Sequence, residues 1–483
     1  MNPLTEFHTQ QTRRAFLERS TLGLGGIALG SLLNGAPERA GRNAIGGMNG
    51  LPHFTPKVKR VIYLFQSGGP SQMDMFDYKP ELAKRFGEEV PESIYPAERK
   101  TTMTSGQKSF PCAPTSLKFS QHGQAGTWLS APLKHLAKQI DDVCVIKSMF
   151  TEAINHDPAA TLFQTGSVIP GRPSMGAWVS YGLGSENANL PAFVAMTSNG
   201  TAKQGQPLYD RLWGAGFLPG RFQGVKFRGQ GDPILDLYNP AGVTRAQRRR
   251  MLDALNKLNQ DQASRFNDPA IATRIAQYEL AFRMQMSVPE LIDTKSEPKS
   301  VLDMYGPDAT KPGRYAYNCL LARRLAERGV RFIQLYHRGW DAHGNAPKGV
   351  AEQCRDTDQG TAALLRDLKQ RGMLDDTLVL FTTEFGRTPF AQSNANQVGP
   401  GRDHNKYGFS CWIAGGGVKS GYSYGQTDEI GWKTVENPVH WHDFHATVLH
   451  LMGIDHKKLT FYHNGIERRL TNVHGHVVSD IFA

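Results

Sequence analysis

Four segments of the chain are mainly apolar, and polar residues or glycines follow each of them. They are residues 59–65, 142–149, 330–336 and 377–383. A short apolar run bounded in this way is typical of a strand that is buried on both faces of a parallel sheet. We therefore predict a strand at each of these four positions.

Between the predicted strands, the apolar residues recur at helical spacing. Residues 344–371 predict a long helix, and residues 245–286 predict another that is long, polar and packed on the outside. Strands that alternate with helices favour an α/β fold, here a doubly wound, mainly parallel sheet with helices on both faces. Residues 79–135 and 200–300 are expected to form insertions or a peripheral subdomain.

Length and composition narrow the class of protein. The 483 residues are enough for one large α/β domain or two ordinary ones. The net charge of +11 suits anionic partners, but the basic residues are scattered and no long block of them argues for nucleic acid. The five cysteines are far apart, so we expect buried thiols rather than a disulfide framework. Beyond the amino terminus, no segment is apolar enough for an integral membrane protein.

The amino terminus has the pattern of a twin-arginine export signal. Arg13 and Arg14 precede Phe16 and Leu17, and an uncharged, glycine-rich run follows at 20–36. This run is too short to cross a membrane, which takes roughly 20 apolar residues. The pattern predicts a bacterial protein that the twin-arginine machinery exports, already folded, to the periplasm or cell exterior. Residues 1–45 would be signal and linker, although a chance arginine pair would look the same.

Acidic residues and histidines follow the predicted strands. They are Asp74, His156, Asp341, His343, Glu384 and His404. Because the carboxyl ends of parallel strands meet at one edge of a sheet, we expect these side chains to converge. Carboxylates and imidazoles together are ligands for Zn²⁺, Mn²⁺ or similar ions, and two such ions about 4 Å apart can promote a phosphoryl-type transfer.

Each of these residues also has a purely structural interpretation. Asp74 could cap a turn or a helix, and Asp157 before Pro158 fits an ordinary helix start. Glu384 and Arg387 could simply form an ion pair. The metal-site hypothesis rests on the joint pattern, since unrelated loops rarely all end in this way.

Several long motifs, in order, resemble the DUF1501 family. They are the segments 67–77 (SGGPSQMDMFD), 155–159 (NHDPA), 383–389 (TEFGRTP), 401–404 (GRDH) and 442–447 (HDFHAT). The resemblance spans residues 46–483 and implies a domain of the alkaline phosphatase-like superfamily, together with sulfatases and phosphoglycerate mutases. It therefore implies a doubly wound α/β core and an ancestral two-metal site for ester hydrolysis.

The resemblance also implies roles for individual residues. Metal ligands would be Asp74, Asp341, His343, Glu384 and His404. The chain departs from the superfamily pattern at two places, because Phe385 replaces a ligand and His156 stands where phosphatases have Ser or Thr. His156 would then be nucleophile, general acid or base, or an extra ligand, and Arg387 would orient the anion.

We therefore expect a metal-dependent hydrolase of phosphate or sulfate esters, holding one or two ions of Zn²⁺ or Mn²⁺. Its substrate would be an anionic ester, including a sulfated or phosphorylated polymer. The alternative is a non-catalytic relative that binds an anionic ligand or another exported protein. A second metal site at His442 and His445 is a further alternative, since the two could share a helix face.

Overall fold

The computed structural model describes most of the chain as two compact units. It covers residues 46–483 except for 95–100, 102, 202–205, 207, 230, 235–236, 267–268 and 394–397. The described residues of the smaller unit are 238–283, and those of the larger unit lie in 46–237 and 284–483. The expected signal around Arg13 and Arg14 lies outside the described residues, so export stays a prediction.

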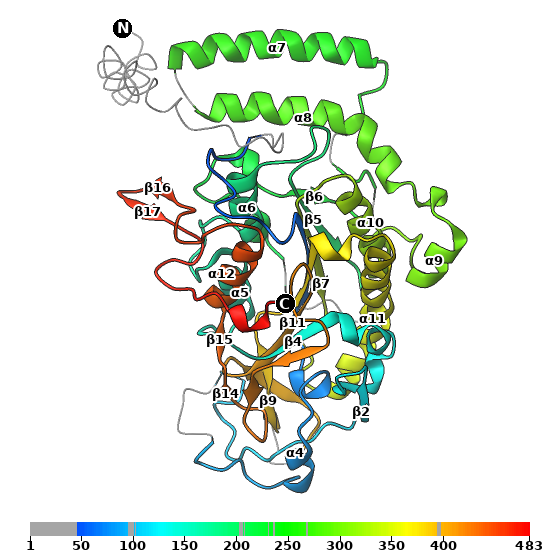
Figure 1. The fold of residues 1–483 in the computed structure, drawn as a ribbon, viewed down its shortest axis with the longest axis vertical. Coiled ribbons are helices and arrows are strands. Elements are labelled where there is room, and N and C mark those ends of the chain that lie inside the picture. The colour runs from blue at the N-terminus through cyan, green and yellow to red at the C-terminus, as the bar shows by residue number, and fades with distance from the viewer. Residues whose placement is uncertain are drawn as a thin grey trace. The chain divides into compact units, whose positions relative to one another are not determined.

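A nine-stranded sheet forms the centre of the larger unit (Figure 1). Its strands are β1 (Arg60–Ser67), β4 (Val143–Phe150), β5 (Phe193–Ser198), β6 (Val225–Phe227), β7 (Phe332–Arg338), β8 (Thr377–Thr382), β11 (Phe409–Gly415), β12 (Tyr422–Tyr424) and β15 (Val439–His440). Eight of them follow the order β12-β4-β11-β8-β1-β7-β5-β6, and β15 pairs with β4. Among the described strands of this sheet, only β11 runs antiparallel to its neighbours, so the prediction of a mainly parallel sheet is confirmed.

The four predicted strands are β1, β4, β7 and β8, and all of them belong to this sheet. β1 lies at the centre, where Val61 pairs with Phe332 of β7 on one side and Leu378 of β8 on the other. β11 is antiparallel to both β8 and β4, so these two strands run in the same direction. The carboxyl ends of all four strands therefore lie at one edge of the sheet.

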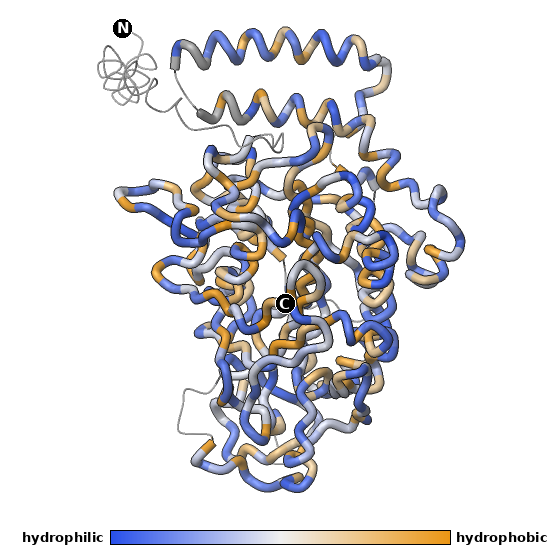
Figure 2. Tube along the Cα trace, in the orientation of Figure 1, coloured by the Kyte–Doolittle hydropathy of each residue, from blue (hydrophilic) through white to orange (hydrophobic). Residues whose placement is uncertain are grey.

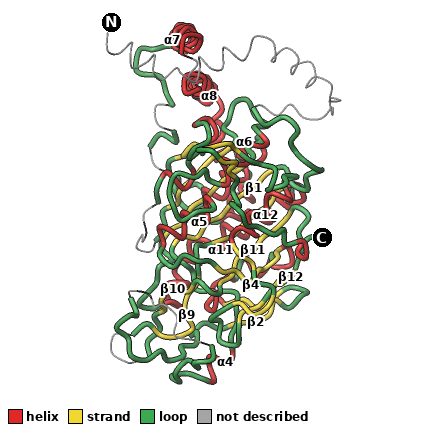
Figure 3. The backbone as a smooth tube through the Cα atoms, turned by 90° about the vertical axis from the view of Figure 1, so that its left-hand side faces the viewer, coloured by secondary structure: helices red, strands yellow, loops and turns green. Residues whose placement is uncertain are grey.

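Helices cover both faces of the sheet, as the alternation of side chains along β1 requires (Figures 1 and 3). On one face lie α5 (His156–Thr165), α6 (Met175–Leu183) and α12 (Trp441–Leu451), and on the other lie α10 (Tyr315–Glu327) and α11 (Ala346–Gln370). Phe65 of β1 stacks on Phe163 of α5, with ring centroids 5.7 Å apart. The next residue, Gln66, faces the opposite way and donates a hydrogen bond to the Tyr315 hydroxyl of α10 at 3.4 Å.

Shorter elements surround this core. They are α4 (Pro80–Lys84), α9 (Lys299–Tyr305) and the paired strands β2 (Phe119–His122) with β3 (Thr127–Ser130), β9 (Gly386–Ala391) with β10 (Arg402–Asn405), β13 (Gln426–Thr427) with β14 (Thr434–Glu436), and β16 (Phe461–His463) with β17 (Ile466–Arg468). Figure 2 shows that apolar positions gather along the central strands. All five cysteines are buried and free. None of the helices in the described residues is long and apolar enough to cross a membrane.

The smaller unit corrects one prediction. Residues 245–286 form two helices rather than one, α7 (Arg245–Phe266) and α8 (Pro269–Ile292). Pro269 explains the new start, because proline lacks the N–H that an uninterrupted helix needs. Within this unit, Arg249 of α7 pairs with Glu279 of α8 at 2.6 Å. The unit falls inside the insertion expected at 200–300, while the exact insertion boundaries stay predictions.

Candidate metal centre

The loops at the carboxyl edge of the sheet carry most of the candidate residues. Asp341 and His343 follow β7, and Glu384 follows β8. The β1 loop packs closely against them, because a Cβ on Gly68 would lie 2.5 Å from the backbone nitrogen of Asp341. Gly68 also has a φ of +122°, a conformation that favours glycine. Glycine at this position therefore allows the loops after β1 and β7 to meet.

Two further elements bring histidines to the same place. His156 is the first residue of α5, which begins after the β4 strand, and Asn155 is the N-cap. His404 lies on β10, directly opposite Arg387 of β9 in the antiparallel pair. A helix does begin here, as Asp157 before Pro158 indicates, although its N-cap is Asn155 rather than Asp157.

Four side chains form a compact cluster of potential metal ligands. One atom each from His156, Asp341, His343 and His404 lies within 4.8 Å of the other three. Oδ1 of Asp341 is 2.8 Å from Nε2 of His343, 3.2 Å from Nε2 of His156 and 3.5 Å from Nε2 of His404. The Nε2 atoms of His343 and His404 are 3.1 Å apart. This is the only such group found within the described residues.

Four of the six separations among these donor atoms match those expected around a single divalent ion. A tetrahedral site with metal–ligand bonds of about 2.0–2.1 Å has ligand atoms about 3.3 Å from one another. The four distances above, 2.8 to 3.5 Å, lie around this value. Nε2 of His156 supports the same interpretation, since it is buried and has no hydrogen-bond partner in the described structure. Asp341 is close to it but does not have hydrogen-bond geometry.

The outer nitrogen of each histidine is already bound to an acceptor. Nδ1 of His156 lies 2.7 Å from Oε1 of Glu384, and Nδ1 of His404 lies 2.8 Å from the carbonyl oxygen of Ile154. Nδ1 of His343 lies 2.6 Å from Oε1 of Gln392, just after β9. A proton on each Nδ1 leaves the Nε2 lone pair free and directed at the cluster. Metal-binding histidines are oriented in this way in proteins.

Burial and charge set the protonation of the cluster. The pKa of His404 is lowered to about 4 by burial, which outweighs its interaction with Asp341, so this imidazole is neutral at pH 7. Burial alone would raise the pKa of Asp341, but the three neighbouring imidazoles and the Arg387 guanidinium hold it well below its usual range. The pKa of His156 is lowered by burial and raised more strongly by the carboxylates of Asp341 and Glu384, so the net direction is upward. The cluster thus keeps one carboxylate charged among three imidazoles.

Glu384 lies beside the cluster rather than within it. Its carboxylate is completely buried and accepts from the Gly68 backbone nitrogen at 2.8 Å, from His156 and from the Thr383 hydroxyl at 3.1 Å. These contacts occupy both oxygens. Glu384 therefore orients His156 in the described structure, and a direct bond from Glu384 to metal stays a prediction.

Asp74 is also engaged elsewhere. One carboxylate oxygen accepts from Nε of Arg402 at 2.9 Å and from the Ser71 hydroxyl at 2.5 Å. The other oxygen is buried and has no hydrogen-bond partner in the described structure. Asp74 does not belong to the cluster of four, so its role as a ligand stays a prediction.

Arg387 connects Asp341 with the loop after β1. Its guanidinium donates to Asp341 Oδ1 at 2.6 Å, to the Gly69 carbonyl at 2.7 Å and to the Gly68 carbonyl. The side chain is 1% exposed. In this geometry Arg387 fixes Asp341 and the β1 loop, and its predicted role of orienting a substrate anion is not tested by any bound ligand.

Two nearby features were not predicted from the sequence. Gln392 orients His343, as described above, and Nε2 of Gln206 donates to Oδ2 of Asp341 at 3.2 Å. Neither lies directly after a strand of the main sheet, so the strand-end pattern gave no signal for them. The alternative site at His442 and His445 has a structural explanation, because their Nε2 atoms bind the carbonyls of Gly166 and Phe163.

The fold and the cluster together define an α/β protein with a histidine–carboxylate centre at the carboxyl edge of a mainly parallel sheet. A family model described as "Protein of unknown function (DUF1501)" matches residues 58–482, and the chain belongs to this family. No curated protein matches the chain.

Similar solved structures include sulfatases and alkaline phosphatases. The PsFucS1 sulfatase from Pseudoalteromonas sp. is 13% identical, covering 86% of this chain and 72% of that one, with a TM-score of 0.36. The alkaline phosphatase from the Antarctic bacterium TAB5 is 13% identical, covering 78% and 96%, with a TM-score of 0.29. Ps i-CgsB in complex with k-i-k-neocarrahexaose is 10% identical, covering 82% and 72%, with a TM-score of 0.36. None of these assigns an activity to this chain.

Proposed function

We propose that this protein is an exported hydrolase of phosphate or sulfate esters that depends on one divalent metal ion. The observation that carries the proposal is the convergence of three histidine Nε2 atoms and Asp341 Oδ1, with every outer histidine nitrogen already bound to an acceptor. This set of donors suits Zn²⁺ best and Mn²⁺ next. One ion is favoured over two because only four donors converge at this place, and both oxygens of Glu384 are engaged in other contacts.

A divalent ion held by these four residues would supply Lewis-acid polarisation of the ester oxygens. The chain itself favours an anion here, because the amino terminus of α5 begins at His156 and helix amino termini attract negative charge. His156 is a ligand in this proposal. The carboxylate of Glu384 accepts the proton on Nδ1 of His156, which leaves Nε2 of His156 free to bind a metal ion.

Water is the attacking group in the proposed reaction. The hydroxyl of Thr161 on α5 is the nearest alternative along the helix, but it is buried and donates to the carbonyl of Asp157 at 2.7 Å. It also accepts from Nε of Arg211 at 3.3 Å. A hydroxyl that is held in this way cannot approach an ester.

A second candidate function is binding without turnover. The polar atoms of Arg387 and Glu384 form hydrogen bonds within the protein, so fewer groups are available for catalysis. A non-catalytic relative with these features would bind an anionic ligand or another exported protein. The net charge of +11 favours an anionic ester or an anionic ligand as the partner, and export would use the twin-arginine machinery.

The test combines metal content with turnover. We expect purified protein to hydrolyse para-nitrophenyl phosphate or para-nitrophenyl sulfate when Zn²⁺ or Mn²⁺ is present, and to lose this activity with a chelator. Asp341→Asn should abolish it, since an amide cannot replace the carboxylate charge. His476→Ala is the matched control, because that side chain is 94% exposed. Bound metal without turnover of either ester, or of any phosphate or sulfate ester tried, would favour the binding protein.

A further inference from the structure

A cavity opens at the same edge of the sheet as the metal centre. It has a volume of about 510 Å³ and lies where β5 and β6 end. Asn199 follows β5, Arg228 follows β6, and Lys226 is on β6 itself. Asp210 also lines the cavity. This cavity has no part in the chemistry described above.

The cavity presents positive charge to solvent. Lys226 and Arg228 are both exposed, and neither forms an ion pair within the part of the chain that the structure describes. Nζ of Lys226 lies 5.2 Å from the centre of the Trp213 ring, and the backbone nitrogen of Arg228 donates to the carbonyl of Pro233 at 2.7 Å. Two cations outweigh the single carboxylate of Asp210, so the cavity suits an anionic group.

The sheet and one ion pair connect the cavity with the metal centre. β6 pairs with β5, and β5 pairs with β7, whose following loop carries Asp341. β6 and β7 therefore lie two strand spacings, about 10 Å, apart within the sheet. Arg211 comes directly after Asp210 and pairs with Asp157, which is the neighbour of His156.

We propose that this cavity binds a second anionic group of a substrate whose first anionic ester lies at the metal centre. The inference rests on the proposed function, and it makes the substrate a chain with repeated anionic groups rather than a small monoester. Such a chain can reach both sites, because both lie at the carboxyl edge of the same sheet. A sulfated glycan and a polyphosphate chain both carry such repeated anionic groups, and the experiment below distinguishes the two.

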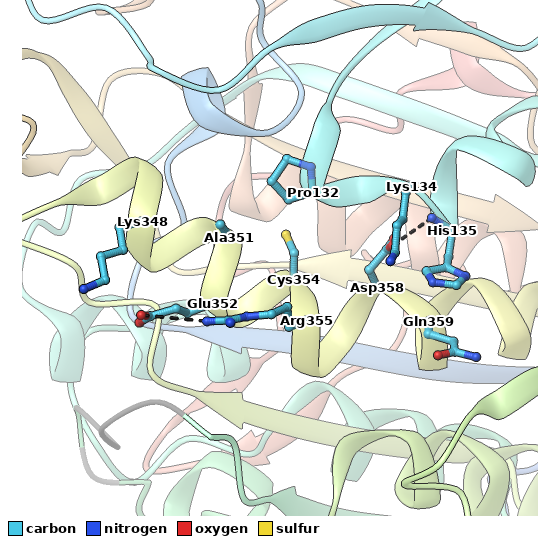
Figure 4. A pocket seen from close by; sticks show the side chains of 10 residues that line it. All are labelled: Pro132, Lys134, His135, Lys348, Ala351, Glu352, Cys354, Arg355, Asp358 and Gln359. Carbon is cyan, nitrogen blue, oxygen red and sulfur yellow. Dashed lines mark hydrogen bonds and ion pairs between the residues drawn. The ribbon is translucent and has the colours of Figure 1, made fainter.

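A different cavity on the same protein serves as a control (Figure 4). It has a volume of about 630 Å³ and lies between α11 and residues 132–135. Lys134 and Lys348 line it and are exposed, as in the proposed subsite. It lies along one side of α11. Neutralising these two lysines therefore removes two positive charges, as in the subsite variant, but at a place away from the carboxyl ends of β5 and β6.

The experiment measures the Kd of the full-length, Zn²⁺-loaded protein for three probes of equal chain length by calorimetry. The probes are a sulfated dextran oligosaccharide, polyphosphate and uncharged dextran. The subsite variant is Lys226→Gln with Arg228→Gln, and the control variant is Lys134→Gln with Lys348→Gln. Lys226→Arg with Arg228→Lys keeps both charges and should keep the affinity. All four positions are exposed, and thermal unfolding confirms that each variant is folded.

We expect the subsite variant to bind the preferred polyanion about tenfold more weakly, the size expected for two exposed ion pairs. The control variant should stay within about twofold of the native protein. Tighter binding of one polyanion identifies the source of the anionic groups. Equal losses in both variants, no loss in the subsite variant, or binding of neither polyanion would overturn the inference. Failure to hydrolyse esters, with this binding pattern intact, would overturn the proposed function alone.

Discussion

Nδ1 of His156 lies 2.7 Å from Oε1 of Glu384, and this contact orients the imidazole so that its Nε2 atom points toward Asp341. The same carboxylate oxygen accepts from the backbone nitrogen of Gly68 at 2.8 Å, so its position is fixed by the β1 loop. With Nδ1 protonated, Nε2 of His156 offers a lone pair to the cluster. Glu384 would therefore act on a bound metal ion through the histidine.

Replacing Glu384 with glutamine should weaken metal binding. The neutral amide is a poorer acceptor for the Nδ1 proton and lowers the basicity of His156, so the affinity for Zn²⁺ should fall about 10- to 100-fold. Competition with a fluorescent chelator measures this change. Glu467→Gln, at an exposed position, is the control. An unchanged Zn²⁺ affinity in Glu384→Gln would contradict the orienting role.

Arg387 should contribute strongly to stability, whereas Arg211 should not. Arg387→Met leaves Asp341 and the Gly68 carbonyl without their donor in a buried site, which should lower the free energy of unfolding by about 3–5 kcal/mol. Arg211 pairs with the exposed carboxylate of Asp157, and Arg211→Met should cost less than about 1 kcal/mol. Urea unfolding of the metal-free proteins compares the two. Equal losses would show that Arg387 has no special structural role.

The main sheet could be predicted from the sequence because its central strands are buried on both faces. β1 and β8 are continuous apolar runs for this reason. β6 has only three residues, and β11 runs antiparallel between two parallel neighbours. The local pattern of apolar residues does not reveal a strand as short as β6 or the direction in which β11 runs, so these two strands were not predicted.

Stability should decrease as the pH falls below 6.5, in part because of His445. This side chain is fully buried on α12, and burial lowers its pKa to about 3. The unfolded chain takes up a proton near pH 6.5 and the folded chain does not, so folding loses up to about 1.4 kcal/mol per pH unit below that value. His445→Gln should therefore show a flatter dependence of the free energy of unfolding between pH 6.5 and 5.

The exposed His476→Gln is the matched variant for this measurement, since its side chain is 94% exposed. It should follow the native pH dependence. If His445→Gln and the native protein lose stability with equal slopes, the buried imidazole at His445 is not responsible for the decrease.

Export should depend on the arginine pair. The double substitution Arg13→Lys and Arg14→Lys should leave the precursor in the cytoplasm, because the twin-arginine machinery recognises this pair as an address. Cell fractionation with an antibody against the protein measures the distribution. An undiminished extracytoplasmic yield of the double variant would rule out the signal.

The site was only partly predictable. Asp341, His343 and His404 were expected as ligands and they do converge, because strand ends meet at one edge of a parallel sheet. Which polar groups pair with one another was not predictable. Arg402 engages Asp74, and Gly68 and His156 engage Glu384, through contacts that link positions more than 200 residues apart. Such pairings depend on tertiary packing, which leaves no local pattern.

The most direct test of the account is the metal content of the protein by mass spectrometry, after purification and dialysis against Zn²⁺. The cluster of His156, Asp341, His343 and His404 predicts one bound ion per chain. His156→Ala should lose that ion, because it removes one of four donors, while His476→Ala should retain it. Full metal occupancy in His156→Ala would show that His156 is not a ligand. A native protein that stays metal-free under these conditions would contradict the metal centre itself.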